Sequence, residues 1–317
     1  ATAARLLCYL SRYVQRSRIF AASRLEIPLP LDTSPPVVTR LPALDPSESV
    51  ALVDRIAYRL GVPVPDGRAI SQRARGNPLL VQLALSGAPA GTRDPLCESL
   101  RSLGPVVRRV LLVATVMRTR CALRDLLLLG EPAESVTAAT QELVRRFLIH
   151  IEDGQVSVPE MIKMAMAEHA AERELAEARR DVAQLHARRF NDDPRAGLLD
   201  CIEAVHHLVT LGDAAAAWAL IERGYPRLLA ANLDPLLAEP LGALRALPGL
   251  DSVEVGTLLA RILLHAGKVG EAKRITDPLL ALPAASRSSA CLCLAAEVTH
   301  RSGLSAQAEA LLRRASE

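Results

Sequence analysis

The chain has 317 residues, half of them hydrophobic and only 3% aromatic, and its 38 Lys and Arg nearly balance its 35 Asp and Glu. The formal net charge of +3 excludes the strongly basic field by which proteins bind nucleic acid or anionic membranes without sequence specificity. The length suggests about two domains, with three or four small ones also possible, and the abundance of Ala, Leu and Arg favours helices over aromatic strands.

The sequence has no features of a secreted or membrane-spanning protein. No apolar run reaches the roughly 18 residues that a membrane-spanning helix needs, and no signal peptide opens the chain. Because the chain starts at Ala1 without a methionine, we expect it to be part of a longer protein. The six cysteines show no CxxC spacing, so reduced thiols in the cytoplasm are expected at Cys8, Cys97, Cys121, Cys201, Cys291 and Cys293.

Residues 1–44 are predicted to be the C-terminal end of an α/β domain. Apolar residues at helical spacing in 3–15 are followed by a short buried strand at 18–24, which ends in Arg24. Ligands of α/β sheets bind at the carboxyl ends of the strands, so Arg24 is a candidate ligand-facing cation. A further extended segment is expected at 37–41. Since two strands cannot form a stable sheet alone, the rest of the sheet is expected outside this sequence.

Residues 45–94 are predicted to form a small helical domain. Asp45, followed by Pro46 and then by Glu48 three positions after the cap, has the pattern of a helix start. The apolar positions that follow have helical spacing and should end at Gly61. The domain should close with a glycine-rich linker that reaches residue 94.

A corner between two short helices is expected at Gly76, Asn77 and Pro78. The helix over 66–75 should stop there because glycine relieves the backbone, and the fixed φ of proline suits the first turn of the next helix. Such a corner can form a wall for a small planar ligand, or it can be an ordinary elbow between helices. Taken alone, residues 75–80 favour the ordinary elbow.

Residues 95–171 are predicted to form a winged helix. Helices are expected at 96–103, 105–117, 122–129 and 132–147, followed by a hairpin whose strands, 148–152 and 155–158, flank Asp-Gly. The last of these helices carries glutamates as well as arginines, whereas a helix that reads DNA is usually more one-sided in charge. A structural or regulatory role is therefore favoured over DNA binding.

Residues 172–317 are predicted to be an α-solenoid. In three places an apolar helix ends at a glycine, Gly212, Gly267 or Gly303, and an alanine follows five positions later where the next helix would pack closest. The last two glycines are 36 residues apart, near the period of tetratricopeptide-type hairpins. The segment 225–250 should be an irregular pair, because prolines interrupt it.

No catalytic or metal-binding residues are predicted. His206 and His207 are adjacent, so on a helix their side chains point about 100° apart and cannot share a metal ion. Cys291 and Cys293 are likewise poorly placed as joint ligands and are expected to be core thiols.

The order of these units resembles the STAND proteins, signal-transducing ATPases that include maltose-activator-like, LuxR-type bacterial regulators. In that family a strand ending in Ser-Arg, a proline-capped helical unit with Gly-Asn-Pro-Leu, a winged helix and helical repeats follow one another. The resemblance implies that Arg24 faces the γ-phosphate of ATP, where a fixed cation can sense the terminal phosphate. It also implies that Pro78 packs on the adenine, with Gly76 and Asn77 in the same nucleotide-binding corner.

The chain departs from the family's pattern in two respects. The sequence has no GxxxxGK[ST] and no acidic strand before Arg24, so this chain alone is not expected to hydrolyse ATP or to bind ATP or ADP with Mg²⁺ tightly. Those segments are expected upstream of Ala1. Where the family has Met-His-Asp, this chain has Val158, Pro159 and Glu160, and a proline offers no donor to the β-phosphate of ADP. This degenerate sensing position argues against locking by ADP.

The sequence therefore predicts a mainly α fold: a remnant of an α/β nucleotide-binding domain, a helical lid, a winged helix and TPR-like repeats. By family likeness it is the regulatory and sensor portion of an ATP-dependent switch, expected in a cytoplasmic transcriptional regulator. A small-molecule or protein inducer on the repeats would permit self-association, and DNA would be bound only by a domain outside this chain. Two alternatives remain: a non-enzymatic scaffold that binds a protein partner, and direct DNA binding by the winged helix.

Overall fold

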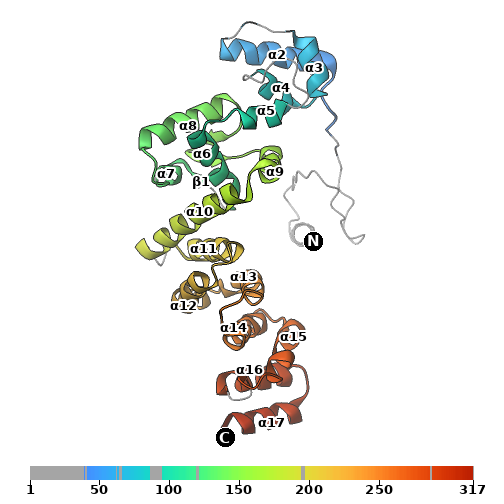
Figure 1. Cartoon of the computed structure of the whole chain (residues 1–317). Coiled ribbons are helices and arrows are strands. Elements are labelled where there is room, and N and C mark those ends of the chain that lie inside the picture. Colours follow the sequence, from blue (N-terminus) through green and yellow to red (C-terminus); the bar gives the residue numbers. More distant parts are fainter. Residues whose placement is uncertain are drawn as a thin grey trace.

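The computed structural model describes residues 39, 41–61, 63, 66–85, 95–118, 121–193, 197–285 and 288–316. It is mainly helical and elongated: a small helical unit lies at one end, a winged helix follows, and stacked helices lead to the other end (Figure 1). None of the described helices combines the length and the apolar character that a bilayer span requires. The predicted strand at 18–24 lies outside the described residues. Of the extended segment at 37–41 only Thr39 and Leu41 are described, and neither is in a strand.

The first unit consists of α2 (Pro46–Leu60), α3 (Gly67–Ala74) and α4 (Pro78–Leu85). The predicted start of α2 is confirmed: the Asp45 carboxylate accepts a bond from the Glu48 N–H, and the Glu48 side chain accepts one from the Asp45 N–H. Gly61 ends the helix in the left-handed conformation, with φ of +64°. The three helices enclose a small core, formed by Val53, Ile56, Ile70, Ala74 and Val81.

The second unit is the one for which the sequence predicts a winged helix, and we refer to it by that name. Its helices are α5 (Pro95–Arg101), α6 (Pro105–Val116), α7 (Leu123–Leu126), α8 (Ala133–Arg145) and α9 (Glu160–His169), and its strands are β1 (Cys121–Ala122), β2 (His150–Glu152) and β3 (Gln155–Ser157). The strands form an antiparallel sheet in the order β1-β3-β2. The hairpin is confirmed, with Asp153 and Gly154 both at positive φ in the turn.

One helix of this unit is shorter than the sequence predicts. The prediction of a helix over 122–129 is wrong at both ends, because Ala122 pairs with Gln155 in β1 and the helix ends at Leu126. A strand of only two residues has no periodicity that a sequence pattern can show. The β1 register comes instead from its pairing with the hairpin, where Cys121 lies opposite Val156.

The third unit is a stack of helices: α10 (Glu172–Asp192), α11 (Leu198–Thr210), α12 (Ala214–Ala230), η1 (Asp234–Leu237), α13 (Ala238–Leu244), α14 (Ser252–His265), α15 (Val269–Leu280), α16 (Ser289–Arg301) and α17 (Ser305–Ser316). The three predicted corners are confirmed. Each glycine has a positive φ between two helices, and the alanine five positions on is buried.

Two details of the stack differ from the prediction. Helix α12 continues through Pro226 to Ala230, whereas a break was expected there. Proline has no N–H, so the carbonyl of Glu222 loses its helical hydrogen bond. Both Pro226 and Glu222 are exposed, so water can bond to that carbonyl instead. In α16, Cys291 is buried as expected but Cys293 is exposed, so its prediction as a core thiol is wrong.

The 21-residue helix α10 connects the winged helix to the stack. Its first two thirds pack in the core of the winged helix through Ala178, Val182 and Leu185, and Phe190 near its end belongs to the core of the stack. A single helix therefore has one end in each of the two large cores, and movement of the winged helix relative to the stack has to bend or shift α10.

Candidate functional site

The corner between α3 and α4 is built as the sequence predicts, and its residues have clear structural roles. Gly76 has a φ of +72°, and its carbonyl accepts a hydrogen bond from the Leu44 N–H at 2.9 Å. The side-chain oxygen of Asn77 accepts bonds from the first N–H groups of α4, at 3.0 Å from Leu79 and 3.4 Å from Leu80. Pro78 occupies the first helical position and is exposed.

Leu44 occupies the side of Gly76 that a larger residue would need. A Cβ on Gly76 would collide with the Leu44 carbonyl oxygen and lie 2.9 Å from the Cβ of Ala43. The absence of a side chain at Gly76 therefore leaves room for the segment at Ala43 and Leu44 that leads into this unit. Of the three corner residues, Pro78 has the exposed side chain that a ligand could contact. Arg24, the other half of the predicted nucleotide site, lies outside the described residues, so the pair stays a prediction.

The predicted sensing position lies at the junction of the wing and α9. Pro159 lies two residues after the end of β3 and is the N-cap residue of α9, where its carbonyl accepts bonds from the N–H groups of Ile162 and Lys163. Glu160 is exposed in the first turn. The carboxylate suits the positive end of a helix dipole, and the proline suits the start of a helix, so both residues have structural reasons to be there.

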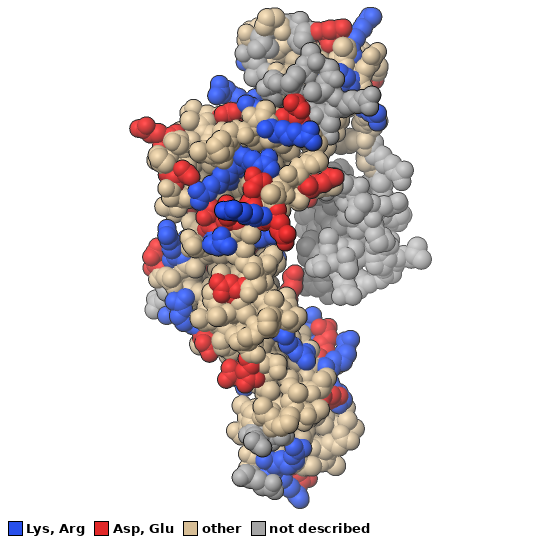
Figure 2. Space-filling model, viewed as in Figure 1, with Lys and Arg blue, Asp and Glu red and all other residues tan. Residues whose placement is uncertain are grey.

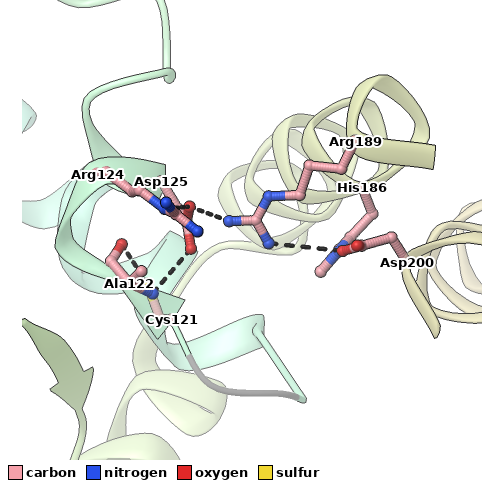
Figure 3. A network of polar contacts seen from close by, with 7 residues as sticks. All are labelled: Cys121, Ala122, Arg124, Asp125, His186, Arg189 and Asp200. Atoms are coloured by element: carbon pink, nitrogen blue, oxygen red, sulfur yellow. Dashed lines mark hydrogen bonds and ion pairs between the residues drawn. The ribbon is translucent and has the colours of Figure 1, made fainter. Parts of the chain in front are cut away.

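A buried ionic network connects the winged helix to the first helices of the stack (Figure 3). The Asp125 carboxylate is only 2% exposed; it accepts a hydrogen bond from the Ala122 N–H at 2.8 Å and pairs with the guanidinium of Arg189. Arg189, on α10, also lies 3.5 Å from Asp200 on α11, and His186 Nδ1 lies 2.6 Å from the same carboxylate. We refer to these four residues, Asp125, His186, Arg189 and Asp200, as the joint network.

The charges of the joint network stabilise one another. Burial acts to raise the pKa of Asp200, but its hydrogen bond from His186 and the charge of Arg189 outweigh burial and lower it. The thiol of Cys121 lies beside the network, and burial raises its pKa to about 11, so it stays protonated. The network therefore acts through carboxylates and cations, and Cys121 is a small apolar neighbour.

Two further ion pairs fasten α10 to α6. The guanidinium of Arg108 forms a bidentate ion pair with the carboxylate of Glu174, with hydrogen bonds of 2.7 and 2.9 Å. These bonds lower the pKa of Glu174. Arg109 contacts Asp181 at 2.9 Å and Glu131 at 2.7 Å. Such planar, paired contacts hold orientation as well as position. Together with the joint network they hold α10 to the winged helix along most of its length.

The winged helix shows no surface of one charge in the view of Figure 2, where Lys and Arg are interspersed with Asp and Glu over this unit and α10. At the C-terminal end of α8, the helix that would read DNA, the cap residue Arg146 pairs with Glu142 at 2.7 Å and donates to the Ser102 hydroxyl at 2.7 Å. DNA-reading helices keep such arginines available for phosphates and bases. This pairing and the mixed charge of the face seen in Figure 2 do not favour direct DNA binding by the wing.

Two further histidines, His206 and His207, lie next to His186 of the joint network. The rings of His186 and His207 are stacked with centroids 6.3 Å apart, and the ring of His206 meets that of His207 edge-on at 5.7 Å. Burial, together with the smaller effects of the nearby His186, His206 and arginines, lowers the pKa of His207 to about 3. His207 is therefore neutral at neutral pH. Among the described residues no group of three or more His, Cys, Asp or Glu side chains is placed to hold a metal ion.

We expect His207 to make the protein less stable in mild acid. Between pH 6.5 and about 3 the unfolded chain binds a proton at His207 that the folded chain excludes, so the free energy of unfolding falls as the pH falls. The contribution is about 1 kcal/mol per pH unit over this window. Urea unfolding of the parent and of His207→Gln, from pH 7 to pH 4.5, measures it as a shallower slope in the variant.

The exposed His150 provides a control for the histidine-to-glutamine substitution itself, and the slope of His207→Gln is compared with that of His150→Gln. Other groups also titrate in this range, so the difference between the two slopes is the quantity that counts. Equal slopes in the parent and in His207→Gln would show that the His207 environment does not exclude the proton.

The stack also contains a groove of about 640 Å³ between η1–α13 and α14–α15. Its floor is apolar, with Leu259, Leu263 and Ile275, and charged side chains surround it. Lys268 and Glu271, which lie 3.5 Å apart, form part of this rim. The volume is in the range of sites for small molecules. The complete lining consists of Pro235, Leu236, Ala238, Glu239, Leu259, Leu263, Lys268, Glu271, Arg274 and Ile275.

The fold resembles that of a solved protein. A signal transduction ATPase with numerous domains (STAND) that carries a tetratricopeptide repeat sensor, from Pyrococcus horikoshii, matches with a TM-score of 0.61 and 14% sequence identity. The match covers 87% of this chain and 41% of that one. No family model matches the sequence, and a search of curated proteins finds no match. At this identity the likeness establishes the fold: this chain is built like part of a STAND protein with a repeat sensor.

Proposed function

We propose that the chain is the regulatory and sensor portion of a STAND-type, ATP-dependent signalling switch. The observation that carries the proposal is the fold likeness over 87% of the chain, in which a small helical unit, a winged helix and helical repeats follow in one order. The groove on the repeats offers a place for a small-molecule or peptide inducer. Helix α10 and the joint network would carry the signal, because they connect the repeats to the winged helix.

In this proposal ATP with Mg²⁺ is bound mainly by segments that are not in this sequence, and the chain contributes the closing side of the site. Pro78 would offer an apolar face to the adenine, and Arg24 would face the γ-phosphate. Inducer binding would change how the winged helix packs, and ATP would then favour self-association. In a bacterial regulator of this type, transcription would be controlled through a DNA-binding domain elsewhere in the protein.

The proposal is tested by nucleotide binding to the full-length protein. Pro78→Ala should weaken ATP binding about five-fold, since a lost contact of roughly 1 kcal/mol changes affinity by that factor. Arg24→Ala should weaken ATP binding while changing ADP binding less, because only ATP has the terminal phosphate. Fluorescence titration with labelled ATP and ADP measures both effects.

Pro63, an exposed proline in the same unit, gives the matched control: Pro63→Ala should bind ATP like the parent. If Pro78→Ala and Arg24→Ala also bind and respond to ATP like the parent, the assignment of these residues is wrong. The groove and Pro159 would then support the second candidate, a helical-repeat scaffold that binds a protein partner without nucleotide switching.

A further inference from the structure

Cys97 and His169 form a thiol–imidazole pair at the junction of α5 and α9. The Sγ of Cys97 lies 2.9 Å from Nε2 of His169, although the two residues are 72 positions apart in the sequence. Cys97 is partly exposed and His169 is exposed, so small molecules in solution can reach the pair. The other described cysteines differ: Cys121, Cys201 and Cys291 are buried, Cys293 is exposed, and none of these four forms a hydrogen bond with a described histidine.

The geometry of the pair suits proton transfer from sulfur to nitrogen. At hydrogen-bond distance the imidazole can take the thiol proton, which leaves a thiolate beside an imidazolium, and the thiolate is the nucleophilic form of cysteine. The backbone at His169 is also held in place, because the His169 carbonyl accepts a bond from Nη2 of Arg108 at 3.4 Å. Nη1 of the same guanidinium donates to the Leu100 carbonyl of α5 at 3.4 Å, so Arg108 holds the two helices beside the pair.

The charges around the Cys97–His169 pair do not oppose proton transfer from the sulfur to the imidazole. The cation of Arg108 is balanced by Glu174, its two-pronged partner on α10. Helix α5 itself contributes Glu98 and Arg101, which are of opposite sign, and α9 contributes Glu168 next to His169. Helix α4, which packs on α5, has no ionisable side chain. The local charge is thus close to balanced, and His169 Nε2 lies at hydrogen-bond distance from the sulfur.

We propose that Cys97 is a redox-modification site that reacts with small disulfides of the glutathione class, with His169 as its positioning base. The Cys97 thiolate attacks one sulfur of the disulfide, a new S–S bond forms, and the old S–S bond breaks. The departing thiolate takes the proton from the imidazolium of His169. Cys97 is oxidised to a mixed disulfide while half of the reagent is reduced, so the step is balanced. This inference does not rest on the proposed function.

Modification would have a structural consequence at this point of the fold. An adduct on the sulfur removes the Cys97–His169 contact between α5 and α9. Helix α5 follows the small helical unit, and α9 leads directly into α10, the helix that reaches the stack. The site therefore lies where a bulky group can alter how the first unit, the winged helix and α10 pack together.

The test compares cysteines within one sample of the intact protein. Iodoacetamide is applied from pH 5.5 to pH 9, and the alkylation rate of each cysteine is followed by peptide mass mapping, which also separates Cys8. At pH 6.5 Cys97 should react at least about five-fold faster than Cys293, and its rate should begin to rise at a lower pH. With oxidised glutathione, the first mixed disulfide should form at Cys97.

His169→Gln separates the role of the base from simple exposure. Because His169 is exposed, the variant should fold, and circular dichroism together with an unchanged Cys293 rate confirms that it does. In this variant the rate at Cys97 should fall to that of Cys293 or below, and its pH profile should move to higher pH. If Cys97 is slower than Cys293 at every pH in the parent, or if His169→Gln leaves its rate and profile unchanged, the proposal is overturned.

Discussion

Replacing Arg189 with methionine is expected to destabilise the protein by about 3–5 kcal/mol, the range for breaking a buried ion pair by removing one partner. The cost arises at Asp125, because its carboxylate is only 2% exposed and pairs with the Arg189 guanidinium inside the joint network. Without the cation the charge stays buried and loses its compensation. Methionine keeps most of the apolar stem of the arginine, so packing changes little. Unfolding by urea, followed by circular dichroism, measures the loss.

A double-mutant cycle separates this electrostatic cost from other effects of the substitution. Asp125→Asn removes the negative charge but keeps an oxygen that can accept the bond from the Ala122 N–H. In the Asp125→Asn background, Arg189→Met should therefore cost less than about half as much as in the parent. The neighbouring Arg188, which is exposed, is the matched control, and Arg188→Met should stay within about 0.5 kcal/mol. Equal costs of Arg189→Met in both backgrounds would show that the ion pair is not the cause.

The joint network also affects how the winged helix, α10 and α11 can move relative to one another. Asp125 belongs to the winged helix, Arg189 to the end of α10 and Asp200 to α11, so the contacts tie three elements that meet at one point (Figure 3). If the repeats control the winged helix, as proposed, these contacts have to be kept or exchanged in the transition. The Arg189→Met substitution should then weaken the coupling between inducer binding and the response of the full-length protein. It should also lower the stability of the protein.

The parts of the fold that could be predicted from the sequence depend on residues that lie close together in the chain. The cap of α2 uses Asp45 and Glu48, three positions apart, and the corners of the stack need one glycine and one alanine five positions on. The spacing of residues within a few positions of one another is therefore enough to predict these caps and corners. The Asp-Gly turn of the hairpin is of the same kind, since both residues adopt positive φ at neighbouring positions.

The features that could not be predicted depend on residues far apart in the chain. Asp125 and Arg189 are 64 positions apart, and no pattern in either segment marks them as partners. Strand β1 has two residues and is defined only by its pairing with β3. The groove on the stack is made by side chains of η1, α13, α14 and α15, which become neighbours only when the helices pack. Of the candidate nucleotide site, the sequence predicts the corner at Gly76, but not that Leu44 packs against it.

Gly76→Ala is expected to destabilise the small helical unit by about 3 kcal/mol, because two costs add. A residue with a Cβ is strained at a φ of +72°, at about 1 kcal/mol or more. The added carbon would also collide with the Leu44 carbonyl oxygen, and overpacking of this kind costs about 1–3 kcal/mol. Hydrogen exchange of the amides in α2, α3 and α4 measures the effect, since it reports the opening of this unit alone.

Gly61→Ala is the matched control, since it has the same backbone strain without the collision. Gly61 has a φ of +64° in the same unit, and nothing lies within 4 Å of the position that its Cβ would occupy. Its substitution should cost only about 1 kcal/mol. The difference between the two variants therefore measures how closely Leu44 packs on the corner. If both substitutions cost the same, the approach of Leu44 does not require glycine at position 76, and the corner is an ordinary elbow between two helices.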